Sequence, residues 1–237
     1  PSPLRTTYYD MNVSAFYNPV IGRWISRDQI GEGGGQNLYR VVGNTPMTRI
    51  DVNGLYQEDG HFYAAIIVAR ANGQSQRNAF GVAYYAQYPD EDPTYDAIPA
   101  GQRLATRRSQ DRVWDSALQE ILHSLHGGNG QESRWRRACL ERLLRRGSSL
   151  ADWERGLLIH ALGDSFAHTR GDTGEGNAFG SPFGHVRSGV DPDIPTLRPQ
   201  LFRAYIGSLS RALGGRANET ELDTIAQSLT RTFNSRG

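Results

Sequence analysis

Residues 157–168 read LLIHALGDSFAH and place His160, Asp164 and His168 at intervals of four. On an α-helix, side chains four residues apart lie on one face, one turn above the other. His160 and Asp164 can therefore point at one ion, and His168 continues the same face. Imidazole and carboxylate are ligands that zinc accepts in catalytic sites, and burying Asp164 among apolar neighbours without a cation is costly. The stretch predicts a metal-binding helix face, and the alternative is a buried hydrogen-bonded pair.

Further candidate ligands lie elsewhere in the chain, and all six histidines fall after residue 56. The other candidates are His61, His123, His126, His185, Asp90, Asp92 and Asp96. Each has a structural alternative. His61 can be a core histidine, and His123 and His126 can cap a helix that ends at Gly127. The three aspartates, which follow a predicted helix, can be turn residues and a cap.

Helical periodicity and end signals predict the elements that carry these side chains. Ser75 caps a helix that Pro89 ends, and Ser149-x-x-Asp152 resembles a capping box that opens the helix of His160. The predicted helices cover residues 75–88, 112–126, 132–146, 149–168, 196–213 and 218–232. Residues 170–195, rich in Gly and Pro, form a long loop. The fold class is mainly α, with six or seven helices. The basic helix 132–146 is typical of a solvated face, and the alternative is a surface for anionic lipid or nucleic acid.

Composition limits the classes of protein to consider. The 237 residues are 38% hydrophobic and 22% charged, as expected of a globular fold. No apolar run approaches the roughly 20 residues that span a bilayer, so we expect no transmembrane segment. The first residues, PSPLRTTYYD, do not resemble a signal peptide. The single cysteine, Cys139, excludes an internal disulfide and is expected at a buried helix position.

The chain changes character near residue 55, which we take as a domain boundary. Residues 1–55 are rich in Gly, Asn, Tyr and Pro, with short strand-like pieces such as TTYYD, RWIS and NLYRVVG between turn signals. From residue 56 onward, helical spacing dominates.

The first part carries specific motifs: YNPVIGRWISRDQIG, NLYRVVGNTP and the closing PMTRIDVNGL. It resembles the end of the core domain of Rhs proteins, the shells of bacterial polymorphic toxins. The resemblance implies self-cleavage between Leu55 and Tyr56, with Asp51 and Asp28 as the acids. The family usually has Asp-Pro where this chain has Asp28-Gln29 and Asp51-Val52.

The Rhs resemblance also implies a biological role for residues 56–237. They would be a toxin domain enclosed in the Rhs shell in cis. A bacterial secretion system, such as type VI secretion, would deliver this effector into a target cell, and a cognate immunity protein would block it. The chemistry of such tips varies, so it depends on the second part of the chain alone.

The order of histidines and aspartates in the second part resembles that of zinc-dependent phospholipases C and of the zinc nucleases that cut single strands. The resemblance implies one to three zinc ions in a helical fold. The implied ligands are His61, Asp90 or Asp96, His123 or His126, His160, Asp164, His168 and His185. Three departures leave the number of ions open. The N-terminal Trp ligand of these families has no obvious equivalent here, although self-cleavage would leave a free amine at Tyr56. Ser165-Phe166-Ala167 stands where these families have Gln-Pro before the next His, and Gly189 stands where they have an acid, which Asp191 or Asp193 would replace.

The expected function is therefore a metal-dependent phosphodiester hydrolase. Asp90, Asp96 and Asp164 are the candidate catalytic acids, and Arg170 and Arg187 are candidates for binding the phosphate. Residues 56–237 contain 21 arginines and 21 acidic residues, whereas nucleases for long polyanions are usually basic. This balance favours a phospholipid substrate, with Phe179, Pro182 and Phe183 touching the membrane. The alternatives are a zinc nuclease and a non-enzymatic membrane-disrupting toxin, which would require long apolar helices.

Overall fold

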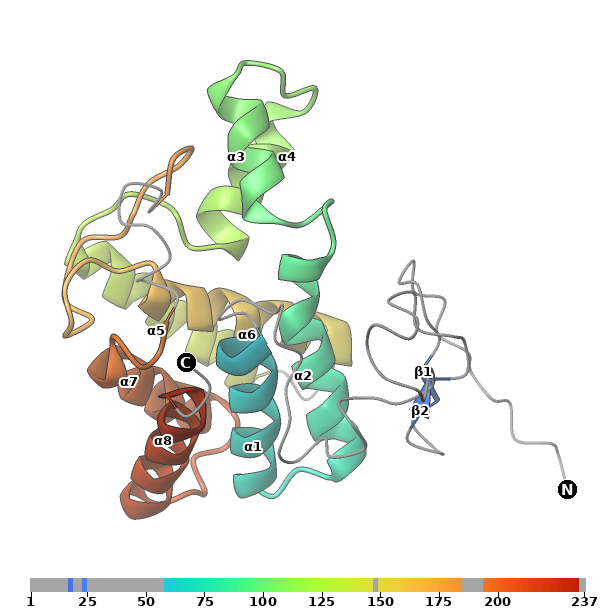
Figure 1. The fold of residues 1–237 in the computed structure, drawn as a ribbon, viewed down its shortest axis with the longest axis vertical. Coiled ribbons are helices and arrows are strands. Elements are labelled where there is room, and N and C mark those ends of the chain that lie inside the picture. Colours follow the sequence, from blue (N-terminus) through green and yellow to red (C-terminus); the bar gives the residue numbers. More distant parts are fainter. Residues whose placement is uncertain (1–16, 19–22, 25–57, 147–148, 185–193, 235–237) are drawn as a thin grey trace, which may run out of the picture. The chain divides into compact units, whose positions relative to one another are not determined.

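The computed structural model describes residues 17–18, 23–24, 58–146, 149–184 and 194–234 (Figure 1). The chain divides into two units, Pro1–Gly54 and Leu55–Gly237, which we describe separately. In the first unit, strands β1 (Tyr17–Asn18) and β2 (Arg23–Trp24) pair antiparallel, with Tyr17 opposite Trp24. The predicted cleavage residues Asp28, Asp51 and Leu55 lie outside the described residues.

The described residues of the second unit are mainly helical, which confirms the predicted fold class for this part. They form eight α-helices, where six or seven were predicted, and two short π-helical segments, η3 and η4. In chain order these are η3 (Glu58–Tyr63), α1 (Ala64–Ala71), α2 (Gln76–Glu91), α3 (Ala97–Ala105), α4 (Arg112–Ala117), η4 (Leu118–Leu122), α5 (Gly130–Arg145), α6 (Asp152–Ala167), α7 (Pro199–Ala212) and α8 (Glu219–Asn234).

Three predicted helix ends were wrong, and two of them affect the site. Pro89 does not end α2, which continues to Glu91. Proline lacks an N–H, but its fixed φ of about −65° is a helical value, so the last residues can continue the helix. The helix predicted to reach residue 126 ends at Leu122, before a turn in which Ser124 has a left-handed φ of 53°. Helix α6 is capped by Ala151, whose N–H donates to Glu154 Oε2, and not by Ser149.

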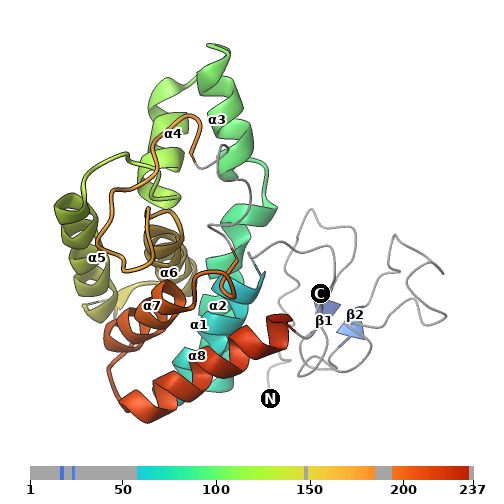
Figure 2. The ribbon, with the colours of Figure 1, turned by 60° about the vertical axis from the view of Figure 1, so that its left-hand side comes forward.

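Helix α6 is the central element of the second unit and packs against α2, α5 and α7 (Figures 1 and 2). From Ile159 to Ala167 every residue of the helix is buried. A helix surrounded on all sides is expected to be apolar all round, and His160 and Asp164 are exceptions to this rule. Gly156 permits the close approach of α2, because a Cβ at this position would collide with the backbone and Cβ of Tyr85.

Helices α3 and α4 form a hairpin that projects beyond the other helices of this unit in both views (Figures 1 and 2). The hairpin is fixed internally by Arg103, whose Nε and Nη2 donate to the buried carboxylate of Asp115 at 2.5–3.1 Å. At its base, the amide of Gln119 donates to the carbonyl of Ala97. These bonds make the hairpin a defined element of the fold.

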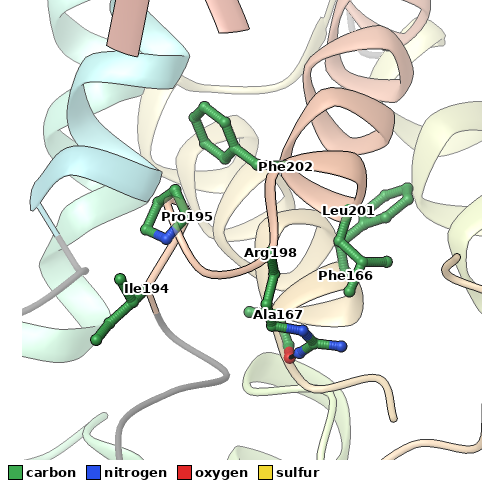
Figure 3. A pocket seen from close by; sticks show the side chains of 7 residues that line it. All are labelled: Phe166, Ala167, Ile194, Pro195, Arg198, Leu201 and Phe202. Atoms are coloured by element: carbon green, nitrogen blue, oxygen red, sulfur yellow. Dashed lines mark hydrogen bonds between the residues drawn. The ribbon is translucent and has the colours of Figure 1, made fainter. Parts of the chain in front are cut away.

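The described part of the predicted loop, residues 170–184, consists of turns and isolated bridges. The buried guanidinium of Arg137 fixes it, donating to Gly174 O at 2.7 Å and to Thr169 Oγ1 at 2.5 Å. A small pocket lies nearby, at the C-terminal end of α6. Figure 3 shows its apolar lining and the guanidinium of Arg198, which binds the carbonyls of Ala167 and Gly171. Among the described helices, none is both long and apolar enough to cross a membrane.

Candidate metal centre

Five side chains from four elements meet beside the middle of α6. They are His61 from η3, Asp90 from the last turn of α2, His123 directly after η4, and His160 and Asp164 from α6 itself. Asp164 lies at the centre. Its Oδ1 is 3.0 Å from His61 Nε2, and its Oδ2 is 3.0 Å from His123 Nδ1 and 3.3 Å from His160 Nε2. We call these five residues the His–Asp cluster.

Asp90 faces the same imidazoles without forming a hydrogen bond to them. Its Oδ2 is 3.6 Å from His61 Nε2, and its Oδ1 is 3.8 Å from His123 Nδ1 and from His160 Nε2. Asp90 Oδ2 is buried and has no hydrogen-bond partner among the described residues. A buried carboxylate oxygen without a partner is costly, and a cation would offset that cost.

Backbone carbonyls determine which imidazole nitrogens face the centre. His160 Nδ1–H donates to Ala86 O at 2.9 Å, and His123 Nε2–H donates to Tyr95 O at 2.8 Å. In neutral rings the opposite nitrogens carry lone pairs, and these two atoms, His160 Nε2 and His123 Nδ1, are only 3.1 Å apart. Two lone pairs at this distance repel each other unless a cation or a proton lies between them.

A zinc ion fits these separations. With Zn–N bonds of 2.0–2.1 Å, two tetrahedral ligand atoms are about 3.3–3.4 Å apart. The measured donor separations in the His–Asp cluster, 3.0–3.8 Å, bracket this value. A hydrogen bond from each ligating imidazole to a backbone carbonyl is also a regular feature of metal sites. The buried donors are therefore of the type and spacing that can hold a metal ion.

The described donors form two overlapping groups, His61–Asp90–His160 and His123–His160–Asp164. Both groups use His160, whose Nδ1–H is already committed to Ala86. His160 therefore has only Nε2 to offer and can bind one ion at a time. The two groups describe alternative ligand sets for a single ion.

The pKa values of the two carboxylates shift in opposite directions. Burial raises the pKa of Asp90 to about 6, the neighbouring carboxylate of Asp164 adds to the rise, and His160 and His123 oppose it. Burial acts on Asp164 as well, but the nearby His160 and His168 imidazoles and the hydrogen bond from His123 hold its pKa well below the usual value. Asp164 is thus an anion in the centre of the domain.

The pKa values of His160 and His123 also shift in opposite directions. Burial lowers the pKa of His160, which keeps it in the neutral form that binds metals. Burial also acts on His123, but the hydrogen bond and charge of Asp164 raise its pKa above the ordinary value. A proton on His123 Nδ1 therefore neutralises Asp164 when no metal does, and the proton and the metal compete for this position.

His168 supports the cluster from the end of α6. Its Nδ1–H donates to His123 O at 2.6 Å, and the same nitrogen is 3.7 Å from Asp164 Oδ2. Ser124 Oγ donates to Ala161 O at 3.0 Å and fixes the same turn. These two bonds attach the backbone around His123 to α6, so His168 acts on the ligand geometry through His123.

The structure does not bring the other described candidates to the cluster. His126 Nδ1 accepts a hydrogen bond from Gly128 N–H at 3.0 Å, and Asp96 Oδ1 caps α3 by accepting from Ile98 N–H at 2.8 Å. Arg170 is exposed and lies over the ring of Phe179, 4.5 Å from its centroid. Phe179 itself is 6% exposed, so its expected contact with a membrane was wrong.

Several candidates lie outside the described residues. These are His185, Arg187, Asp191 and Asp193.

Gly163 is a position in the candidate site that the sequence analysis missed. A Cβ at Gly163 would lie 2.8 Å from Cε1 and 2.9 Å from Nδ1 of His61, closer than real Cβ atoms approach other atoms. The glycine therefore admits the His61 imidazole to the surface of α6. Its place directly before Asp164, in HALGD, was the available signal.

Tyr205 of α7 also lies next to Gly163. Its ring carbon Cζ lies 3.3 Å from the position of that same Cβ, and its buried hydroxyl has no hydrogen-bond partner among the described residues. Burial and the charge of Asp164 raise the pKa of Tyr205, so this hydroxyl stays protonated. It is a hydrogen-bond donor close to the His–Asp cluster.

The chain was compared with protein-family models, curated proteins and solved structures, and none of them matches it. The function of the site therefore has to be argued from its own geometry.

We predict that Gly163→Ala displaces His61 and lowers the affinity for metal by about 10- to 100-fold. The matched control is Gly207→Ala in α7, where the new Cβ meets only flexible arginine side chains. That change is expected to leave metal affinity unchanged. Zinc titration with a competing chromophoric chelator measures both variants, and equal affinities in the two would contradict the role given to Gly163.

We also predict that the purified full chain binds one zinc ion through the described ligands. His160→Ala and the nearly isosteric Asp164→Asn should each abolish this binding, whereas His126→Ala, which alters a half-buried histidine outside the cluster, should retain it. Elemental analysis after dialysis measures the metal, and circular dichroism verifies the fold. If the folded wild type stays metal-free when zinc is supplied, the cluster is only a buried hydrogen-bond network.

Proposed function

We propose that residues 56–237 form a zinc-dependent hydrolase of phosphodiesters, with phospholipids as its substrates. The observation that carries the proposal is the buried His–Asp cluster, whose donors form two overlapping groups that share His160. The orientation of His160 and His123 supports the proposal further. Their outer nitrogens donate to backbone carbonyls, so His160 Nε2 and His123 Nδ1 face each other at 3.1 Å, where a metal ion or a proton can lie between them.

Zinc suits this donor set, which combines neutral imidazoles with carboxylates. When bound, zinc lowers the pKa of a coordinated water toward about 7 and polarises phosphoryl oxygens. The protein contributes position and charge. Ala86 O and Tyr95 O orient His160 and His123, Asp164 supplies a permanent negative charge, and Asp90 offers an oxygen that no other described group uses.

Hydrolysis of a phosphodiester needs an acceptor for the proton of the attacking water. Asp90 Oδ2 fits this role, because it borders the cluster and has no hydrogen-bond partner among the described residues. The bond formed joins the water oxygen to phosphorus, and the bond broken joins phosphorus to the leaving alkoxide, which takes up a proton. Asp96, the alternative acid, is engaged in capping α3.

The charge of the domain favours a phospholipid over a nucleic acid as the substrate. With 21 arginines and 21 acidic residues, residues 56–237 lack the excess of positive charge that usually supports binding to a polyanion. A single-strand nuclease is the alternative reading of the same site, and the choice of substrates in the test below separates the two.

We further propose that this domain is the toxin tip of an Rhs polymorphic effector. The motifs of residues 8–55 support the proposal, and a delivered toxin that hydrolyses phospholipids would damage membranes of the target cell. A cognate immunity protein is then expected to cover the site in the producing cell.

We predict that Asp90→Asn lowers zinc-dependent hydrolysis by about 100-fold or more, since it removes the proton acceptor and a charge. Asp96→Asn is the matched control and should keep full activity, because asparagine caps helices as well as aspartate does. The assay supplies zinc and compares phosphatidylcholine and phosphatidylglycerol in detergent micelles with single-stranded DNA. Cleavage of DNA alone would identify a nuclease, and the absence of zinc-dependent cleavage of every substrate would contradict the hydrolase.

We predict that the full chain cleaves itself after Leu55. Mass spectrometry and N-terminal sequencing should find a fragment that begins YQEDGH, and Asp51→Ala should leave the chain intact. Asp59→Ala, on the other side of the junction, is the control and should not prevent cleavage. A wild-type chain that stays intact would contradict the proposed junction.

A further inference from the structure

The α3–α4 hairpin is a feature for which the candidate metal centre gives no explanation. It projects beyond the other helices of its unit (Figures 1 and 2), and α3, with nine residues, is about 13 Å long at 1.5 Å per residue. Packing against the core does not require such a projection. The internal bonds of Arg103 to Asp115 show that the hairpin is held in this form and is not a loose loop.

The tip of the hairpin carries positive charge without partners. Arg107, Arg108 and Arg112 are exposed, and none of them forms an ion pair with the described residues. The one acidic side chain between them, Asp111, accepts a hydrogen bond from the backbone N–H of Trp114 and caps α4. The tip can therefore attract an anionic surface.

The arginines of α5 provide a contrast within the same domain. Arg134 pairs with Glu175, Arg136 with Glu132, and Arg145 approaches Glu141. Much of the charge of that basic helix is thus neutralised by neighbours. The positive charge at the hairpin tip is not neutralised by any ion pair with the described residues.

Apolar side chains accompany the charge at the tip. Val113 is 81% exposed, and the neighbouring Trp114 is also exposed, with part of its ring against Tyr95. Phe183, 65% exposed, lies in the loop whose Pro182 carbonyl would be 2.7 Å from a Cβ at Gly101 of α3. Arginine beside exposed aliphatic and aromatic side chains is typical of surfaces that enter the interface of an anionic bilayer. Nucleic-acid interfaces are more polar, so aliphatic Val113 favours a lipid partner.

The base of the hairpin adjoins the His–Asp cluster. Tyr95, just before α3, accepts the hydrogen bond from His123, and Asp90 lies in the last turn of the helix that leads into the hairpin. Surface-binding elements enter the lipid interface by about 5–10 Å. A projection about 13 Å long would then leave its base within a few ångströms of the lipid headgroups, where the phosphodiesters are.

We propose that the tip of the α3–α4 hairpin docks this domain on anionic phospholipid membranes and brings the His–Asp cluster to the headgroups. The inference rests on the proposed phospholipid hydrolase and names the surface on which that enzyme works. Arg107, Arg108 and Arg112 attract the anionic lipids, and Val113 inserts into the membrane interface.

The test is co-sedimentation of the full chain with phosphatidylcholine vesicles prepared with and without phosphatidylglycerol, in the presence of a chelator so that no lipid is cleaved. We expect binding only to the vesicles that contain phosphatidylglycerol. Arg107→Ser with Arg108→Ser should lower the partition coefficient by about tenfold or more. The matched control removes two exposed arginines at the end of α5, Arg142→Ser with Arg146→Ser, and should change it by less than about twofold.

Val113→Ser tests insertion separately from charge. It should weaken binding to the phosphatidylglycerol vesicles, whereas Leu143→Ser on α5 should not. Equal losses for the hairpin and α5 variants would overturn the proposal, since binding would then depend on overall charge. Loss of binding to single-stranded DNA in the hairpin variants, with no vesicle binding by the wild type, would identify a nucleic-acid surface and also overturn it.

The micelle assay separates this inference from the proposed function, because detergent micelles present the lipid without a bilayer. Zinc-dependent cleavage in micelles without vesicle binding would overturn the docking surface and leave the hydrolase intact. Vesicle binding that depends on the hairpin, without cleavage in micelles, would leave the docking surface intact and contradict the hydrolase.

Discussion

The buried carboxylate of Asp164 is the interaction on which the arrangement of this domain depends. It lies on α6, which is enclosed by α2, α5 and α7, and its charge has to be compensated at a buried position. Three imidazoles from three elements face the carboxylate through their nitrogens, and a proton on His123 or a cation between the donors compensates the charge. Each imidazole then requires its own support. Ala86 of α2 and Tyr95 before α3 provide it for two of them. The helices around α6 are thus connected by polar contacts as well as by apolar packing.

The hydrogen bonds that hold the imidazoles in place also determine whether the cluster can bind a metal. A neutral imidazole oriented by a backbone carbonyl is ready to bind a metal, but it cannot also neutralise a nearby anion. The cluster therefore has two ways to balance its charge, a proton on His123 or a cation at the centre. The choice between them depends on conditions and not on a rearrangement of the fold, because the donors are already in place.

The part of the site that could be predicted from the sequence depends only on the geometry of a single helix. The spacing of four between His160 and Asp164 placed both on one side of a helix, which requires only helical geometry. The choice of Asp90 among three aspartates could not be made, because it depended on α2 continuing past Pro89. The separation of His123 from His126 depended on a π-helical turn and a left-handed Ser124, which hydrophobic periodicity does not indicate. The carbonyls that orient the imidazoles leave no trace in residue types, since every residue has one.

Gly163 has a consequence for recognising other proteins of this kind. The glycine is required by a histidine about one hundred residues away, so the two positions are bound to vary together in any chain that keeps the arrangement. The string His-x-x-Gly-Asp on a buried helix, with a histidine shortly before the first helix of the domain, is therefore a compact signature of the centre. A search with this string would select chains on steric grounds, whatever the divergence of their remaining sequence.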